Sequence, residues 1–475
     1  MTSPEDQSIL YHNEPNTVFI IDIPSSIAQA QGLTPDPRDG TAGTSAGDLE
    51  PGRNVSRKHI LSAPPLESPY AGSCEPKTEA ARARLLEQVP TNEKLFHDEI
   101  QPLLLSALHG IRGKYRGARW CRPRHFSDEE IPRTRKRRAE PEYVTLEKRT
   151  QNLLKGSSTA KVSRSHHAAP NIRPPTILSS TSTNVFESIS SLDGIVRNPS
   201  SQPALLKADC HDGIEPAPSE YIIPPESQFI LCTIPISEPR PKSTFPISGL
   251  PSTQKFNLVL FDPPWPNRSV RRSGHYSTHP YELLTQRLQD ILHMHAFTSD
   301  QTPPLNNLYR YPQSQLSLAG IWTTNSEKSR QTAYDSLTST GFTVVEEWIW
   351  IKITANGDPV SPVNGLWRKP YEILVIGRRE PVSVTVPEPE IPFSSCKSLE
   401  PDPCVPKRRF IAAVPDLHSR KPNLKGLFER LFFARDGSVQ QYTALEVFAR
   451  NLTAGWCAAG NEVIKFNARE CWVEG

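Results

Sequence analysis

The stretch LVLFDPPWPNRS carries four residues that could do chemistry directly after an apolar run: Asp262, Pro263, Pro264 and Trp265. Two prolines end a strand and donate no N–H, so the carbonyl groups beside them are stiffly aimed. A carboxylate next to a carbonyl can accept both hydrogens of a planar amino group, and Trp265 offers a flat face to a heterocycle. The combination suits an exocyclic amine on a nucleobase or a similar amide. The same four residues could also form an ordinary tight turn.

An adenine amine is a poor nucleophile because its lone pair is delocalised into the ring. Two acceptors that hold its hydrogens favour a pyramidal nitrogen and localise that lone pair, which stabilises the transition state. The reaction then needs an electrophile held in line at about 3 Å and a route for the lost proton. It needs no metal, and we predict none: the eight cysteines form no CxxC pair and have no histidine at zinc-finger spacing.

The elements that must position this tip lie in residues 216–475, which we predict to be the catalytic domain. Apolar runs predict strands at Phe229–Cys232, Phe256–Phe261, Leu318–Trp322, Phe342–Lys352, Tyr371–Gly377, Phe410–Val414, Tyr442–Phe448 and Glu462–Phe466. Helical spacing predicts helices at Tyr281–Leu292, Glu327–Thr340 and Asn423–Phe433. Alternating strands and helices indicate an α/β sheet that is largely parallel, with ligands at the carboxyl ends of its strands. Two Pro-rich insertions, 299–313 and 380–407, are predicted to be loops outside the core.

The first 215 residues have a different composition. Residues 1–78 are rich in Pro, Ser, Gly and Asp and are expected to be mostly disordered, apart from one apolar run, Thr17–Ile23, that could be a strand or a docking segment. Residues 79–128 are predicted to be helical with a basic, aromatic end that either binds nucleic acid or packs on the catalytic domain. Residues 129–215 are expected to be a disordered basic and Ser/Pro-rich linker.

Bulk properties exclude several classes of protein. The net charge of +3 says little about partners. No apolar run approaches the roughly 20 residues that span a bilayer, so no membrane association is expected. The N-terminus does not have the pattern of a secretory signal, and the cysteines are expected to be reduced thiols. The run RTRKRR at 133–138 favours nuclear import or a nucleic-acid contact. We therefore expect the nucleus as the location, with the cytoplasm as a second one.

The catalytic region as a whole resembles a known family. FDPPWPNRSVRRSGHYS is similar to the DPPW-type adenine N6-methyltransferases, the family of the messenger-RNA adenosine methyltransferase catalytic subunit, and most similar to the branch of methyltransferase-like protein 4. Co-linear blocks continue the resemblance over about residues 220–475: IWTTN (321–325), EEWIWIK (346–352), RKPYEILVIGR (368–378), HSRKPNLKGLF (418–428) and LEVFARNLTAGWCAAGNEVIKFN (445–467). The first 215 residues match only loosely.

The resemblance implies a Rossmann-like fold in permuted motif order that uses S-adenosylmethionine (SAM). Asp262 and the Pro263 carbonyl, in the tip completed by Pro264, would hold the target amine, with Trp265 and Tyr276 flanking the adenine. Lys421 would meet the carboxylate of SAM. The remaining cofactor contacts would come from Ile234, Asp262, Arg450, Asn451, Asn461 and Glu462. Glu347 and Lys352 would line the substrate side, and Arg268, Arg271 and Arg272 would contact phosphates unless they belong to a solvated loop.

One departure from the family pattern stands out. Relatives carry an Asp where this chain has Thr233, at the segment that contacts the SAM adenine. Thr233 keeps a hydroxyl and the backbone, so weaker SAM binding is one expectation, and a pseudoenzyme is another. The complete DPPW argues against the pseudoenzyme, because inactive members of the family have lost that motif.

Three functions remain after these arguments. The first is methylation of an RNA adenine, for which the resemblance to the branch of methyltransferase-like protein 4 implies small nuclear RNA, with 2′-O-methyladenosine as a target. The second is the same chemistry on DNA adenine, since a pocket that reads only the base edge cannot exclude either. The third is a non-catalytic nucleic-acid-binding protein. RNA is favoured over DNA as the partner, and the chain is expected to be a monomer unless it has a protein partner.

Overall fold

The structure is a computed structural model of the 475-residue chain. It describes residues 8–33, 58–70, 78–126, 174–209, 218–236, 245–265, 281–298, 316–365, 369–379, 405–417 and 420–474. None of the helices in this part of the chain combines the length and apolar character that a bilayer span requires. Both predicted Pro-rich loops and the basic run at 133–138 lie outside the described residues, apart from residues 405–407, which lead into a strand.

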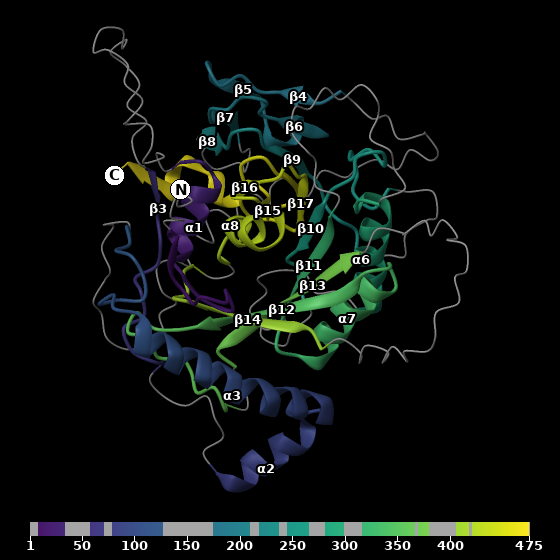
Figure 1. Cartoon of the computed structure of the whole chain (residues 1–475). Coiled ribbons are helices and arrows are strands. Elements are labelled where there is room, and N and C mark those ends of the chain that lie inside the picture. The colour runs from purple at the N-terminus through teal and green to yellow at the C-terminus, as the bar shows by residue number, and fades with distance from the viewer. Residues whose placement is uncertain are drawn as a thin grey trace, which may run out of the picture.

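A twelve-stranded sheet forms the centre of the molecule (Figure 1). In spatial order its strands are β1 (Ile9–His12), β2 (Val18–Ile21), β14 (Lys407–Ala413), β12 (Thr343–Lys352), β13 (Tyr371–Arg379), β11 (Ser317–Thr323), β10 (Leu258–Phe261), β17 (Ala444–Val447), β18 (Cys457–Gly460), β9 (Gln228–Leu231), β6 (Ile195–Arg197) and β4 (Thr176–Ile177). Most neighbouring strands are parallel, while β13 runs antiparallel to both β11 and β12. The predicted α/β class with a largely parallel sheet is confirmed.

Strand β10 lies between β11 and β17 and is parallel to both. All four of its residues are buried, as expected for a central strand covered on both faces. The chain leaves β10 at Phe261, so residues 262–265 emerge at the edge where β11 and β17 also end. The catalytic tip is therefore fixed by the most buried part of the sheet.

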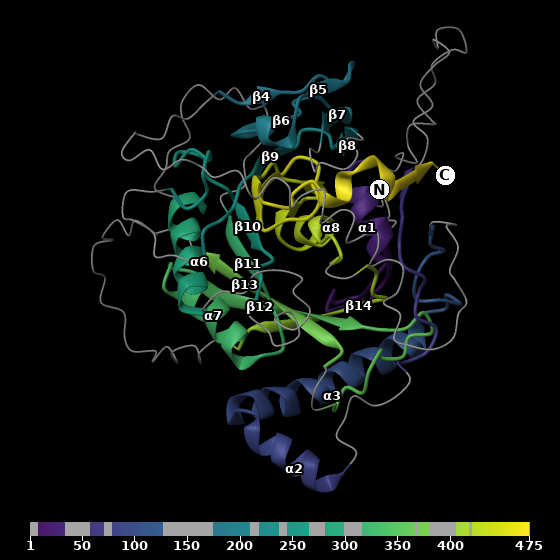
Figure 2. The same ribbon diagram turned by 180° about the vertical axis from the view of Figure 1, so that it is seen from behind.

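Each face of the sheet packs against its own helices. On one face lie α3 (Thr91–Lys114), α6 (Tyr281–His295) and α7 (Glu327–Thr338), whose apolar residues pack with Ile349 and Ile351 of β12. On the other lie α1 (Ile23–Ala30) and the short α8 (Lys425–Phe428), which continues as a π-helix over Glu429–Phe433 and packs against Trp348 and Trp350. Helices α6 and α7 lie side by side in both views (Figure 2). Successive residues of β12 thus serve opposite faces.

Local sequence signals explain where several helices begin. Helix α7 starts after Ser326, whose hydroxyl accepts a hydrogen bond from the backbone N–H of Ser329 at 3.2 Å. The carboxylate of Asp22 does the same for Ser25 at the start of α1, at 3.1 Å. Such caps satisfy backbone donors that the first turn leaves unpaired. Helix α6 instead is held mainly by its apolar face, with Leu288 fully buried.

The N-terminal residues take part in the central sheet. Strand β2 confirms the alternative that Thr17–Ile23 is a strand, because it pairs in parallel with β14. The expectation that the rest of residues 1–78 lacks structure is wrong for β1 and α1. Ile23 and Ile27 of α1 are fully buried, so this short helix does bury enough surface to be ordered.

The linker prediction for residues 129–215 is wrong for residues 174–209. Strands β4 and β6 extend the central sheet beyond β9, and β5 (Asn184–Phe186), β7 (Ala204–Asp209) and β8 (Pro218–Ile223) form a sheet of their own. Val196 and Leu206 are fully buried. The Ser- and Thr-rich composition concealed short strands that carry few but well-placed apolar side chains. Smaller pairs are β3 (Lys58–Ile60) with β19 (Trp472–Glu474), and β15 (Ala434–Arg435) with β16 (Ser438–Val439).

One predicted strand in the catalytic region is also wrong. Glu462–Phe466 lies in a turn that leads into a short 3₁₀ helix at Lys465–Asn467, and the nearby strand of the sheet is β18. Val463, Ile464 and Phe466 are buried. The apolar pattern therefore indicated burial correctly, but these residues do not form a strand. Strand β18 has the sequence CAAG, whose small residues give a weak strand signal.

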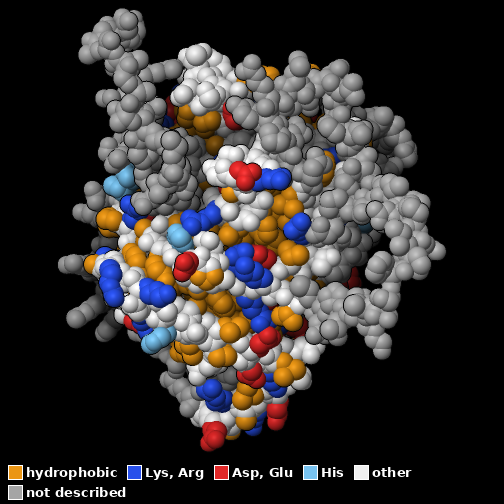
Figure 3. Space-filling view, in the orientation of Figure 1, with side chains coloured by type: hydrophobic (Ala, Val, Ile, Leu, Met, Phe, Trp, Pro, Cys, Tyr) orange, Lys and Arg blue, Asp and Glu red, His pale blue; other side chains and the backbone are white. Residues whose placement is uncertain are grey.

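The helical segment after residue 78 begins with α2 (Glu79–Gln88), which has no buried residues and projects from the catalytic body (Figure 1). Part of its basic end packs on the protein: Trp120 is 6% exposed, and Arg124 donates to the carbonyl oxygens of Val414 and Pro415 at 2.8 Å. Lys114, Arg116 and Arg122 are exposed. Arg112 pairs with Asp358 at 2.5 Å. On the face seen in Figure 3, acidic and basic side chains alternate over the lower half of the molecule. Of the two alternatives for residues 79–128, these contacts favour packing.

Candidate functional site

The DPPW tip is locked at the end of β10. The backbone N–H of Asp262 donates to the carbonyl oxygen of Val447 at 3.2 Å, which ties the tip to β17. The indole N–H of Trp265 donates to the carbonyl oxygen of Trp322 at 2.7 Å, which ties it to β11. The backbone N–H of Trp265 also donates to the Pro263 carbonyl at 2.9 Å. That carbonyl, expected to be free, keeps one lone pair for a ligand.

The position of Trp265 bears on one expectation. Its side chain is only 4% exposed, and its ring packs beside that of Tyr281, with 6.0 Å between centroids. A side chain in this position fixes the tip to its neighbours. Trp265 does not line the pocket described below. The described contacts give Trp265 a structural role, and the expectation that it also flanks the adenine stays a prediction.

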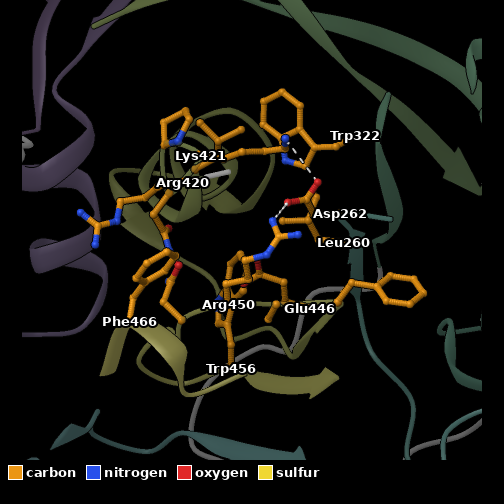
Figure 4. A pocket seen from close by; sticks show the side chains of 15 residues that line it. Leu260, Asp262, Trp322, Arg420, Lys421, Glu446, Arg450, Trp456 and Phe466 are labelled. Carbon is orange, nitrogen blue, oxygen red and sulfur yellow. Dashed lines mark hydrogen bonds and ion pairs between the residues drawn. The ribbon is translucent and has the colours of Figure 1, made fainter. Parts of the chain in front are cut away.

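Asp262 brings together the two cations that the resemblance assigned to the cofactor. Lys421 Nζ lies 3.3 Å from Asp262 Oδ1, and Arg450 Nη1 lies 3.2 Å from Asp262 Oδ2 (Figure 4). The three side chains come from the end of β10, the segment before α8 and the segment after β17. Residues separated by more than 150 positions in the sequence are thus in direct contact. Burial would lower the pKa of Lys421, but the carboxylates of Asp262 and Glu372 raise it, so the ammonium stays charged.

A second carboxylate links Lys421 to Lys352. Glu372 of β13 accepts from Lys421 at 2.7 Å and from Lys352 of β12 at 2.5 Å. Burial raises the pKa of Glu372, and the two ammonium groups outweigh this and lower it well below its usual range. Lys421 is therefore held between two carboxylates, Glu372 and Asp262. A ligand carboxylate that meets Lys421 would find an ammonium already positioned.

Two further acids, Glu462 and Glu446, lie on the β17 side. Arg450 Nε is 3.2 Å from Glu462, which also pairs with Lys465 at 3.4 Å. Burial raises the pKa of Glu462, and Lys465 and Arg450 more than offset it, so this carboxylate is ionised. Glu446 of β17 behaves in the opposite way. Burial first, and the charge of Asp262 second, raise the pKa of Glu446 to about 8 in spite of Arg450.

These side chains surround a pocket with about 520 Å³ of empty space, part of it open to solvent. Its polar wall includes Asp262, Lys421, Glu446, Arg450 and Asn451, and its apolar wall includes Leu260, Trp322, Leu424, Phe448, Trp456 and Phe466. Phe448 adopts φ 64°, an unusual conformation for a side-chain-bearing residue, directly before the segment that carries Arg450.

The donor set fits the cofactor that the resemblance implied. SAM carries a carboxylate, an ammonium, a sulfonium and two ribose hydroxyls. The pocket offers cations at Lys421 and Arg450, carboxylates at Asp262 and Glu446, and an amide at Asn451, with aromatic side chains around them. Opposite charges therefore stand within one cavity, as a zwitterionic cofactor with an added positive charge requires.

Other predicted cofactor residues lie nearby without lining this pocket. Glu462 acts through Arg450, as described above. Asn461 is exposed just after β18. Ile234 is 7% exposed and packs in the core on the α6 face, so the described structure gives it a packing role. Thr233, its neighbour, is exposed.

The predicted substrate residues divide between two faces of the sheet. Lys352 joins the pocket network through Glu372. Glu347 does not: it is 2% exposed, and it accepts from Tyr334 of α7 at 2.9 Å and from Arg408 at 3.0 Å. Glu347 therefore lies on the α7 side of β12, whereas Lys352 lies on the pocket side, and a substrate contact by Glu347 stays a prediction. Arg268, Arg271, Arg272 and Tyr276 lie outside the described residues.

Sequence reasoning missed Glu372, Glu446, Trp322 and Phe448. Each belongs to a block that was singled out, but each was counted as part of an apolar strand. A signal existed for the two acids, because a carboxylate inside a buried apolar strand is costly unless it serves a partner or a ligand. The contact between Glu372 and Lys421 joins segments 49 residues apart and had no local signature.

Comparison with known proteins agrees with this geometry. Residues 256–462 match the MT-A70 family model. A protein of Cryphonectria parasitica named N6-methyladenosine RNA methyltransferase MTA1 is 36% identical over 250 residues, which cover 49% of this chain and 62% of that protein. The protein of the same name from Pyricularia oryzae is 27% identical over 486 residues, covering 98% of this chain and 96% of its own. Mouse N(6)-adenine-specific methyltransferase METTL4 is 32% identical over 261 residues, which cover 54% of this chain and 45% of that protein.

Proposed function

Because residues 256–462 form an MT-A70 domain, we propose that this chain is a SAM-dependent N6-adenine methyltransferase acting on nucleic acid. The relatives named above are N6-adenine methyltransferases by name, an activity that takes its methyl group from SAM. One observation carries the proposal: Asp262, the acceptor for the amine, touches both Lys421 and Arg450 in the same pocket. The site for the amine and the site for the methyl donor are thus adjacent.

The residues divide the work as follows. Asp262 and the remaining lone pair of the Pro263 carbonyl accept the two hydrogens of the adenine amine and localise its lone pair. Lys421, steadied by Glu372, meets the cofactor carboxylate, and Arg450 and Asn451 meet the ribose hydroxyls. When bound, SAM supplies an electrophilic methyl group. Trp265 holds the tip in place by its bond to Trp322, so Asp262 does not have to reorganise during the reaction.

We propose RNA rather than DNA as the nucleic acid. Two relatives are named as RNA methyltransferases, and the one from Pyricularia oryzae aligns over nearly the whole chain. Small nuclear RNA with 2′-O-methyladenosine is the narrower substrate that we propose, with a nuclear location. The target base has to be unstacked or single-stranded to reach a pocket at the edge of a sheet.

A single experiment tests both levels of the proposal. The purified full-length chain is incubated with labelled SAM and matched RNA and DNA oligonucleotides, with and without a 2′-O-methyl group on the target adenosine. The products are digested to nucleosides and identified. We expect N6-methyladenosine from RNA. Label in DNA only would replace the RNA assignment, and label in neither would favour the non-catalytic alternative.

The matched variant is Asp262→Ala. We expect it to remove methyl transfer while leaving the SAM dissociation constant nearly unchanged, because Lys421, Arg450 and Asn451, the groups assigned to the carboxylate and the ribose of SAM, remain. Glu429→Gln is the control, since Glu429 bonds to Tyr442 at 3.0 Å and does not line the pocket. Wild-type turnover in Asp262→Ala would remove Asp262 from the reaction.

A further inference from the structure

Glu446 stands apart from the other acids of the pocket. It pairs with Leu260 of β10 in the parallel register, so its side chain emerges on the same face as Leu260 and Asp262. All three residues line the pocket. The close view shows Glu446 beside Arg450 and below Asp262 (Figure 4). The carboxyl group of Glu446 therefore points into the same pocket as the carboxylate of Asp262, which holds the amine.

The other acids in and behind the pocket wall have basic partners. Asp262 pairs with Lys421 and Arg450, Glu372 pairs with Lys421, and Glu462 pairs with Arg450. Within the part of the chain that the structure describes, Glu446 forms no such ion pair and no side-chain hydrogen bond. A carboxylate in a pocket without a partner is costly, and that cost is relieved by a cation. The pocket thus holds one acid more than its own ion pairs account for.

We propose that Glu446 recognises the positive charge on the sulfur of the methyl donor and makes the pocket prefer the cationic cofactor to its neutral thioether product. This inference rests on the proposed function. A methyl group presented to an amine at Asp262 must lie close to that carboxylate, and so in the field of Glu446 on the neighbouring strand. Of the two carboxyl groups on this face of the sheet, Asp262 would hold the adenine amine and Glu446 would face the sulfonium.

The same arrangement has a consequence for turnover. Once the methyl group has been transferred, the sulfur is neutral and the attraction to Glu446 is gone, while the carboxylate and ribose contacts of the product remain unchanged. Glu446 is therefore a specificity-determining residue that separates substrate from product by charge. It discriminates against the species that would otherwise compete for the pocket.

The charges around Glu446 set the pH dependence. Asp262 faces it from the end of β10, Arg450 from the segment after β17, and Lys421 from the segment before α8, with Glu372 and Glu462 behind these two cations. The pKa of Glu446 is raised to about 8 by burial and by Asp262. Below that pH the carboxyl is protonated, and a cationic ligand must displace the proton. Affinity for a cationic ligand should therefore rise with pH up to about 8 and then level off.

The test is calorimetry on the full-length chain with three ligands: SAM, S-adenosylhomocysteine and sinefungin, in which a protonated amine replaces the methylsulfonium. SAM and S-adenosylhomocysteine share the carboxylate, the α-ammonium and the ribose, so their affinity ratio isolates the charge at sulfur. In Glu446→Gln at pH 8.5 we expect SAM and sinefungin to bind about tenfold more weakly, the factor that corresponds to about 1.4 kcal/mol. S-adenosylhomocysteine should change by less than about twofold on the same reasoning.

The matched control is again Glu429→Gln, which removes a carboxylate from outside the pocket and should leave the affinity ratio unchanged. An equal loss of affinity for all three ligands would overturn the proposal, because Glu446 would then contact a group that they share. No change in any ligand would overturn it as well. In wild type the ratio should rise from pH 6.5 to 8.5, and in Glu446→Gln it should stay flat. Failure of wild type to bind SAM would instead refute the proposed function.

Discussion

Lys421 is the residue on which the cofactor assignment depends most directly. Its ammonium lies between Asp262 and Glu372, at 3.3 and 2.7 Å, and sits 5.2 Å from the centre of the Trp322 ring. The two acids fix its position without using all of its donors, since an ammonium has three. An incoming carboxylate can therefore join the group without rebuilding it.

Replacing this lysine gives a prediction that contrasts with the one for Glu446. Lys421→Ala should raise the dissociation constants of SAM and S-adenosylhomocysteine alike, by at least about tenfold, because both carry the carboxylate and a charged pair is lost. Calorimetry on the purified variant measures both constants. The control is Lys425→Ala, since Lys425 pairs with Glu429 at 2.8 Å and does not line the pocket. Unchanged binding in Lys421→Ala would exclude Lys421 from the cofactor site.

At the scale of single elements, the basic, aromatic segment that follows α3 contacts the rest of the protein through Trp120. The backbone N–H of Trp120 donates to the carbonyl oxygen of Ala355 at 2.8 Å. Its ring fills the space beside Gly357, where a Cβ would lie 2.4 Å from the indole, and Gly357 itself has φ 84°. Only glycine meets both conditions at this position. Trp120 therefore fastens the α3 segment to the loop that follows β12.

Trp120→Ala should lower the stability of the chain rather than its affinity for nucleic acid. Truncation of a buried tryptophan costs about 3–5 kcal/mol, so the thermal midpoint should fall by several degrees. Arg116→Ala, at an exposed position of the same segment, should change stability by less than about 0.5 kcal/mol. Differential scanning fluorimetry and filter binding measure the two properties separately. Loss of RNA affinity in a Trp120→Ala chain of wild-type stability would restore the nucleic-acid alternative for this segment.

The elements also show what could be predicted from sequence. Strands β10, β11, β12 and β13 were predictable because long apolar runs dominate them, and the DPPW tip was predictable because prolines end β10. Strand β18 was not, since it consists of small residues and pairs with β9, which lies far earlier in the chain. Strands β4 to β7 were not, since they are short and lie in a Ser- and Thr-rich stretch. The side of β12 that Glu347 occupies was not predictable, because a motif match does not say which face of a strand a side chain occupies.

For the whole molecule, the catalytic fold is larger than the region that resembles the family. Strands β1 and β2 complete the sheet beyond β14, and β4 and β6 complete it beyond β9. Asn467 links the family-like region to the N-terminal residues, because its amide donates to Gln31, at the end of α1, at 3.0 Å, and to the carbonyl oxygen of Ile222 in β8 at 2.9 Å. The family-like region therefore depends on residues on both sides of the expected boundary at 216.

A fragment of residues 216–475 should not fold stably, although it holds every proposed site residue. Its sheet would lose partners at both ends, and buried side chains such as Ile411 and Phe229 would be uncovered. We expect it to be insoluble or to lack a cooperative thermal transition by circular dichroism. Co-expression with residues 1–215 as a separate chain should restore a soluble complex. A fragment that melts within a few degrees of the full chain would contradict this view of the sheet.

The pairing of β2 with β14 has a consequence for how the protein is made. Arg409 donates to the carbonyl oxygen of Asn16, a residue 393 positions earlier. Strand β2 pairs early with β1 but must wait for almost the entire polypeptide before its second partner, β14, exists. Contacts so distant along the chain slow folding, and an unpaired apolar strand invites association with other chains meanwhile. During synthesis, the time that Phe19 and Ile20 spend without their neighbour should set the yield of active protein more than any event at the pocket.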